Sequence, residues 1–334
     1  MNTPRLSALL FPFTLMLLAF PSAEAGVYKC TDAKNRVHYQ DKPCQELTAA
    51  KLSTHLSQLG EASENHYFLW KAASEKGVVY LLGSLHFGTQ DMYPLPEGIM
   101  DAFSAADVLV VEANVQNQGS SGEVARQLAS KGVYVDGSSL EDHVKPVTWR
   151  KLNELAKRLG VKDEVLRLQK PWLAALTLTG QALKQAGFRE ELGVEQAFIK
   201  EAGAKKPILE MESVEQQIKL FDEFSAQEQE QMLLQSIQDL ARGPEIFKNI
   251  ADAWRKGDAE AIDLITRQSF DSGPVAAKLF KVLFADRNIA MTNKIDELLA
   301  DRRTYFVVIG AGHIAGEQGI LKLLETRGYR ITQP

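Results

Sequence analysis

The stretch Tyr305-Phe306-Val307-Val308-Ile309-Gly310-Ala311-Gly312-His313 lies near the carboxyl end of the chain. Its first five residues are aromatic or β-branched, which predicts a buried strand. The glycines that follow allow a tight turn and a close approach of the backbone. A histidine therefore comes just after the carboxyl end of a strand, where open α/β sheets place their ligands.

The same pattern occurs near the start of the chain. Residues 78–82 predict a second buried strand, and Gly83-Ser84-Leu85-His86 follows it. Because the carboxyl ends of parallel strands meet at one edge of a sheet, we expect the fold to bring His86 and His313 together. This pair is the main functional clue in the sequence.

Acidic residues follow two further predicted strands. Glu112 ends the run 107–111, whose four consecutive apolar residues predict a strand buried on both faces, as in a parallel sheet. Glu210 and Glu212 end a short strand predicted at 207–212. An isolated buried carboxylate is costly, so each must leave the core or be paired. Capping of the next helix is the alternative role, which we favour for Glu210 but not for Glu212.

The order of the elements predicts an α/β fold with a mostly parallel central sheet and a large helical insertion. Residues 96–106 have the helical spacing of a crossover between the first two strands. Residues 146–301 are mostly helical, and capping boxes pair Ser213 with Gln216 and Ser225 with Glu228. The predicted helices are 146–159, 165–186, 193–202, 213–224, 225–240 and 274–299. The last predicted elements are a strand at 304–309, a helix near 317–327 and an edge strand at 329–332.

The first 25 residues predict a cleaved signal peptide. Arg5 supplies the positive charge, residues 9–20 form an apolar segment too short for a typical membrane span, and Ala23-Glu24-Ala25 fits the cleavage pattern. No later apolar run approaches the roughly 20 residues of a membrane helix. We therefore expect a periplasmic or secreted protein with no stable membrane span.

A small β-hairpin is predicted at residues 26–46. The sequence has two cysteines, Cys30 and Cys44, and in an exported chain these are expected to form one disulfide. A metal site at the two cysteines is the alternative, which we disfavour because no further ligands flank them at zinc spacing. Residues 47–66 are expected to be a linker, and residues 67–334 the main domain.

Composition and motifs argue against several function classes. The formal charge of −5 and the lack of a dense basic block disfavour nucleic-acid binding. Gly310-x-Gly312-x-x-Ala315 matches a dinucleotide fingerprint, but that motif normally opens a βαβ unit and this one lies at the end of the chain. A serine hydrolase lacks support, because no G-x-S-x-G elbow occurs.

Histidines and glutamates at strand ends predict a site for a divalent cation such as zinc, manganese or cobalt. Such an ion polarises a carbonyl or lowers the pKa of a bound water. The sequence has no H-E-x-x-H motif, and a single histidine after a strand is more often a turn or packing residue. The predicted ligands are His86, His313, Glu112 and Glu212.

From about Tyr67 to Thr332 the chain resembles the TraB/GumN family, which includes the Tiki-type proteases. The resembling segments are YLLGSLHFGTQDMYPLP, DVLVVE, GVEQAF, LEMESVEQQIKLFDEF, AWRKGD, LFADRN and FVVIGAGHIAGEQGILKLLETRGY. The resemblance implies an erythromycin-esterase/ChaN-like fold and a metal-dependent, peptidase-like active site. VYKCTDAKNRVHYQDKPC resembles a hairpin module of exported bacterial proteins. The family's site positions fall on His86, Glu112, Glu195, Glu212, Arg287 and His313.

The leading hypothesis is an exported, metal-dependent, peptidase-like hydrolase whose substrate is a peptide or small molecule. In this hypothesis Glu195 acts as a general base, and Arg287 holds a carboxylate or a developing oxyanion. The alternative is a non-catalytic binding protein of the cell envelope that holds a peptide or small molecule in the same pocket. A third possibility, a lactone esterase, rests on fold analogy alone.

Overall fold

The computed structural model describes residues 28–31, 37–40, 67–114, 121–271 and 273–334. The chain divides into two compact units between Lys42 and Pro43. In the first unit, β1 (Tyr28–Thr31) and β2 (Val37–Gln40) pair antiparallel. Three predictions fall outside the described residues: the signal peptide at 1–25, the linker at 47–66, and the disulfide, which requires Cys44.

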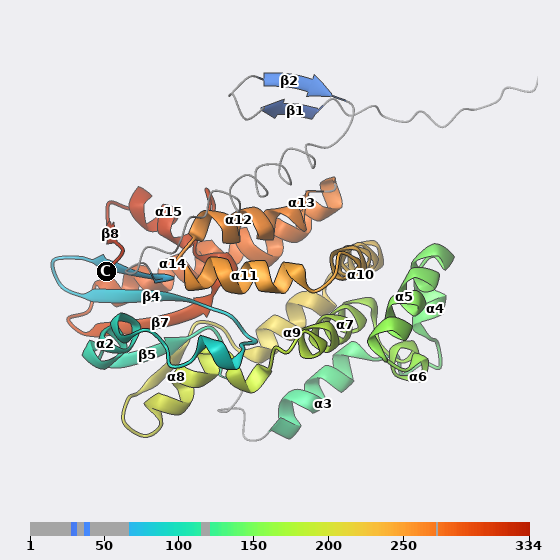
Figure 1. Ribbon diagram of the computed structural model, residues 1–334, viewed down its shortest axis with the longest axis horizontal. Coiled ribbons are helices and arrows are strands. Elements are labelled where there is room, and N and C mark those ends of the chain that lie inside the picture. The colour runs from blue at the N-terminus through green and yellow to red at the C-terminus, as the bar shows by residue number, and fades with distance from the viewer. Residues whose placement is uncertain (1–27, 32–36, 41–66, 115–120, 272) are drawn as a thin grey trace, which may run out of the picture. The chain divides into compact units, whose positions relative to one another are not determined.

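The second unit is built on a six-stranded sheet with the order β6-β5-β7-β4-β3-β8. Strands β6, β5, β7 and β4 run parallel, whereas β3 is antiparallel to both of its neighbours. This arrangement confirms the predicted α/β fold with a mostly parallel sheet (Figure 1). The strands are β3 (Leu69–Ala73), β4 (Val78–Ser84), β5 (Val108–Val111), β6 (Ile208–Glu210), β7 (Thr304–Gly310) and β8 (Arg330–Thr332).

The two strands that precede the histidines lie side by side at the centre of the sheet. The register of β4 and β7 runs from Val78 opposite Thr304 to Ser84 opposite Gly310. The loops that carry the two Gly-x-x-His motifs therefore leave the same edge of the sheet. β5 pairs with the other side of β7, so Glu112 emerges at that edge as well.

Helices pack against the sheet and close its core. Phe103 of α2 (Glu97–Ala105), Phe198 of α8 (Val194–Ala202) and Phe306 of β7 form a cluster with ring centroids 4.8–5.5 Å apart. Trp254 of α11 (Glu245–Arg255) is buried, and its indole N–H donates to the carbonyl of Gly83. The other helices packed around this core are α11 (Glu245–Arg255), α12 (Ala259–Gln268), α14 (Asp286–Leu299) and α15 (Ile320–Thr326).

The helical insertion has a core of its own, with buried leucines from α4 (Leu140–His143), α5 (Pro146–Leu159), α7 (Pro171–Gln185) and α10 (Ala226–Ala241). The predicted helix 146–159 and both capping boxes are confirmed. The helices of the insertion are α3 (Ser121–Gly132), α4 (Leu140–His143), α5 (Pro146–Leu159), α6 (Asp163–Arg167), α7 (Pro171–Gln185), α9 (Val214–Asp222) and α10 (Ala226–Ala241).

Two predicted helices are interrupted. The helix predicted at 165–186 is wrong as a single element, because Pro171 begins α7 and disfavours helical backbone at the residue before it. The helix predicted at 274–299 consists of α13 (Pro274–Phe280), a π-helical turn (Lys281–Ala285) and α14. Among the described residues, no helix has the length and hydropathy to cross a bilayer.

Candidate functional site

A pocket of about 670 Å³ opens at the carboxyl edge of the central strands. Residues at and after the ends of β4, β5 and β7 contribute polar groups to it, and α7 of the insertion, α11, α12 and the loops between elements contribute apolar groups. The polar and charged residues that line the pocket include His86, Glu112, Glu190, Arg287 and His313.

Glu112 is buried directly after β5, where its carboxylate is fully engaged. Its Oε2 accepts a hydrogen bond of 2.8 Å from the backbone N–H of Gly310, and its Oε1 accepts from Arg287 NH2 at 2.6 Å. Gln217 Nε2 donates to the same Oε1 at 3.0 Å. Burial opposes ionisation, but the charges of His313, His86 and Arg287 lower the pKa of Glu112 to about 2.

Arg287 lies between two carboxylates at the start of α14, directly after the π-helical turn. Its Nε donates to Glu212 Oε1 at 2.9 Å, and its NH2 donates to Glu212 and to Glu112, each at 2.6 Å. Its NH1 donates to the carbonyl of Leu283 and to His313 Nε2, each at 3.1 Å. A guanidinium has five N–H donors, so all five are used within the protein.

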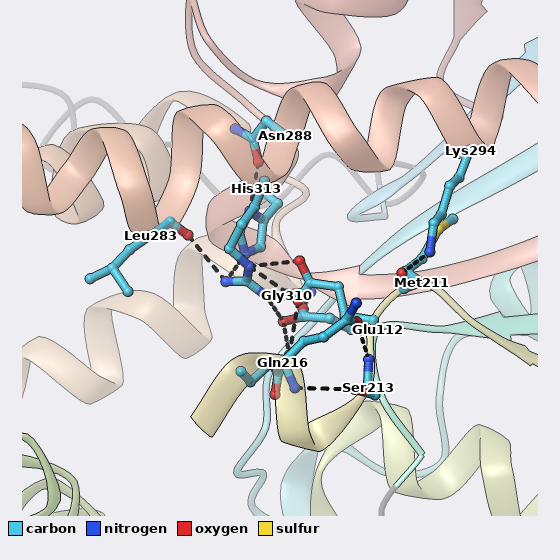
Figure 2. A network of polar contacts seen from close by, with 12 residues as sticks. Glu112, Met211, Ser213, Gln216, Leu283, Asn288, Lys294, Gly310 and His313 are labelled. Carbon is cyan, nitrogen blue, oxygen red and sulfur yellow. Dashed lines mark hydrogen bonds and ion pairs between the residues drawn. The ribbon is translucent and has the colours of Figure 1, made fainter. Parts of the chain in front are cut away.

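His313 is buried at the end of the short 3₁₀ turn Ala311–His313 (Figure 2). Its Nδ1 lies 2.6 Å from Asn288 Oδ1, while Asn288 Nδ2 donates to the carbonyl of Gln318 at 2.7 Å. Because the amide oxygen is the acceptor, Nδ1 carries the proton and Nε2 accepts from Arg287. Burial is the main cause that lowers the pKa of His313 to about 4, so this imidazole is neutral at pH 7.

His86 differs from His313 because its side chain is 59% exposed. Its Nδ1 lies 3.9 Å from Oε2 of Glu195, which is in the first turn of α8. The other oxygen of Glu195 accepts from the backbone N–H of Glu112 at 2.8 Å. Burial, reinforced by the charge of Glu112, raises the pKa of Glu195 to about 7.

The two histidines face the same glycine. A Cβ added to Gly310 would lie 3.5 Å from His313 Cδ2 and 3.7 Å from His86 Nε2. His313 Cδ2 and His86 Nε2 are therefore at most about 7.2 Å apart, which is the sum of these two distances. The structure thus brings His86, Glu112, Glu195, Glu212, Arg287 and His313 into one connected cluster.

A sequence profile described as the TraB/PrgY/gumN family matches residues 68–333. The chain belongs to the TraB/PrgY/gumN family. An uncharacterized protein of Escherichia coli K12, YbaP, is 24% identical over 73% of this chain and 87% of its own length. An uncharacterized protein of Treponema pallidum is 20% identical over 79% of this chain and 82% of its own length. A second profile, a domain of unknown function (DUF4124), matches residues 14–58, and no solved structure matches the chain.

In this TraB/PrgY/gumN protein, the donors of the predicted metal site are turned toward other groups. Glu112, Glu212 and His313 each direct a donor atom to Arg287, whose positive charge lies where a shared cation would be needed. No group of three or more His, Cys, Asp or Glu side chains in the described part of the chain could hold a metal ion. A bound cation remains a prediction, but the positions of the predicted ligand atoms do not fit one.

Two residues of the TraB/PrgY/gumN site were missed by the sequence analysis. Asn288 orients His313, and Gln217 donates to Glu112 at 3.0 Å and to Glu212 at 3.2 Å. Both occur in segments that carry the family resemblance, LFADRN and MESVEQQ. Asn288 directly follows Arg287, which was a signal for that residue, whereas Gln217 lies five positions after Glu212. The partners of both amides depend on the tertiary fold.

Proposed function

We propose that the pocket is the active site of a hydrolase that uses water to cleave the acyl bond of a carbonyl compound, with His86 as the general base. One observation carries the proposal: an exposed imidazole borders the pocket through Nε2 and has a buried carboxyl beside Nδ1. A carboxyl at Nδ1 favours the tautomer in which Nε2 is free to take a proton. The predicted signal peptide supports a periplasmic or secreted location.

Glu195 is suited to assist this proton transfer. Its pKa of about 7 lies close to neutral pH, where efficient acid–base groups are found. When His86 Nε2 takes a proton from water, an ionised Glu195 stabilises the imidazolium. Strongly shifted pKa values in a pocket are typical of functional sites.

The remaining charged residues hold the geometry of the site. Glu112 links Arg287 to the backbone N–H of Gly310 and so fixes the turn between β7 and His313. Arg287 in turn holds Glu212 and His313. These groups therefore act as positioning residues in the proposal, and no step depends on a metal.

Turnover by the full-length protein tests the proposal. We expect hydrolysis in assays with p-nitrophenyl esters and a peptide library, and a loss of about 100-fold or more in kcat/KM for His86→Ala. His143→Ala is the matched control, because His143 lies in α4 and is bonded to Ser138 outside the pocket. Turnover that is unchanged in His86→Ala would contradict the assignment.

A non-catalytic binding protein is the second candidate. The observation in its favour is that Arg287 has no N–H left to stabilise an oxyanion. In that case the full-length protein binds a peptide or small molecule in the pocket, and neither wild type nor His86→Ala shows turnover above a buffer control.

A further inference from the structure

We infer that the pocket takes an uncharged ester or amide with an apolar acyl chain and rejects the corresponding free acid. The inference rests on the proposed hydrolase function and adds the class of substrate. Two features carry it. Apolar side chains line much of the pocket, and its polar groups include carboxylates that repel an anion.

One wall of the pocket is a second apolar face of α7. Leu176, Thr179, Gly180 and Leu183 line the pocket at the spacing of one helical face. A different face of α7 is buried in the protein core. The buried residues of this face include Trp172, Ala174, Ala175, Leu178 and Ala182. Leu176 is 44% exposed, although it is a large apolar side chain. The helix therefore presents apolar surface to the pocket that no group of the described protein covers.

Gly180 widens this wall. A Cβ added at Gly180 meets no heavy atom within 4 Å, so the backbone of α7 borders open space at this point. Glycine lowers helix stability relative to alanine by roughly 1 kcal/mol, so helix propensity does not account for a glycine at position 180. Free space beside Leu176 and Leu183 is what an apolar chain lying along the helix requires.

Other elements add apolar side chains to the lining of the pocket. Phe188, Phe247 and Phe284 contribute aromatic rings, and Ile250 and Ile262 contribute aliphatic side chains. Pockets for small molecules combine such walls with a few polar groups that fix orientation. An apolar chain that enters this space removes these apolar surfaces from water, which stabilises the complex.

The polar side of the pocket offers a carboxylate no free N–H of an arginine or lysine among the described lining residues. Among the described residues that line the pocket, Arg287 is the one arginine and there is no lysine. All five N–H groups of Arg287 already donate hydrogen bonds within the protein. It faces two carboxylates, Glu112 and Glu212, so the three charges leave a net negative site. Glu190 adds a further acidic side chain to the lining. An anionic ligand would meet repulsion from these carboxylates without a free arginine or lysine to compensate for it.

An uncharged carbonyl group meets no such repulsion and can be approached by a water held at His86 Nε2. In the reaction the oxygen of water bonds to the acyl carbon, and the bond from that carbon to the leaving oxygen or nitrogen breaks. One proton of water passes through His86 to the leaving group, and the acid product then ionises. The same negative site that admits the neutral substrate therefore favours release of the carboxylate product.

Binding of octanamide and sodium octanoate to the full-length protein tests the inference by calorimetry or NMR titration. We expect octanamide to bind about tenfold or more tightly, because octanoate loses hydration without gaining a partner. Gly180→Trp fills the space beside α7 and should abolish octanamide binding, whereas Gly180→Ala should retain it. Octanoate that binds equally or more tightly, or octanamide that binds equally to Gly180→Trp, would overturn the inference.

Turnover separates this inference from the proposed function. With p-nitrophenyl esters from acetate to octanoate, we expect kcat/KM to rise by about fourfold for each methylene that the pocket buries. Turnover that is independent of chain length would overturn the substrate class while leaving the hydrolase proposal intact. Selective binding of octanamide without turnover of any ester or amide would support the inference about the pocket and reject the hydrolase.

Discussion

Arg287 NH2 and Glu112 Oε1 are 2.6 Å apart, although the two residues are separated by 175 positions in the sequence. The bond joins the start of α14 to the end of β5, and the same guanidinium also holds Glu212 and His313. Because Glu112 reaches on to the N–H of Gly310, the arginine fixes both of the strand ends that flank the pocket. This cationic centre is the main structural feature of the site.

Replacement of Arg287 by alanine should strongly destabilise the protein. It leaves the buried carboxylate of Glu112 without its partner, and breaking one side of a buried ion pair costs about 3–5 kcal/mol. Urea unfolding of the full-length protein measures the effect. Arg303→Ala is the matched control, because Arg303 pairs with Asp301 at the exposed surface and should change stability little. Equal effects of the two variants would show that the Glu112–Arg287 pair is not a major source of stability.

Asn288→Asp should raise the pKa of His313. The amide oxygen now accepts from Nδ1, and a carboxylate at that position would stabilise the imidazolium that burial disfavours. NMR titration of the imidazole should show His313 changing charge near pH 4 in the wild type and at higher pH in the variant. An unchanged midpoint would mean that Asn288 does not contact this ring in solution.

Glu195 should make the protein less stable as pH rises toward and through neutrality. Its folded pKa of about 7 lies above the usual value of 4.5, so the folded state binds more protons between these values. Stability contributed by the protonated carboxyl is therefore fully present below pH 4.5 and is lost as pH rises through 7. Urea unfolding of wild type and Glu195→Gln between pH 5 and 8 checks this. In the variant the free energy of unfolding should fall less steeply with pH over this range. Parallel pH curves for the two proteins would contradict the raised pKa of Glu195.

Two glycine-to-alanine substitutions should have opposite effects. Gly180→Ala should raise the free energy of unfolding by about 0.5–1 kcal/mol, because Gly180 is helical and its Cβ position is open. Gly83→Ala should lower it by about 1–3 kcal/mol, because the added Cβ would lie 2.3 Å from the ring of buried Phe68. Thermal or urea unfolding compares the two, and a stabilising Gly83→Ala would show that β4 and Phe68 pack differently.

Removal of metal ions should leave the protein folded. Since Arg287 pairs with both Glu112 and Glu212 and donates to His313 Nε2, we expect EDTA treatment to leave the unfolding midpoint unchanged. Elemental analysis of protein purified without added metal should find less than a stoichiometric amount of zinc, manganese or cobalt. A stoichiometric ion that is lost in His86→Ala would instead support the metal site predicted from the sequence.

The sequence by itself determined the central strands and the ends at which polar residues gather. The runs at 78–82 and 304–309 are apolar enough to predict buried strands, and β4 and β7 lie there as parallel neighbours. Capping boxes predicted the starts of α9 and α10, because the two side chains that fix such a helix end lie within four residues of each other in the sequence. The family resemblance supplied Glu195 and Arg287, which no local pattern distinguishes.

The tertiary structure alone decided how these residues are paired. β3 was not predicted, and neither was the π-helical turn before Arg287, because their stability comes from neighbouring elements rather than from a local pattern. The sequence pattern predicts Glu112, Glu212 and His313 as metal ligands, whereas in the fold all three contact Arg287. A buried charge takes whichever partner the packing brings within hydrogen-bonding distance, and contacts across 175 residues are fixed only when β5, α9 and α14 have packed together.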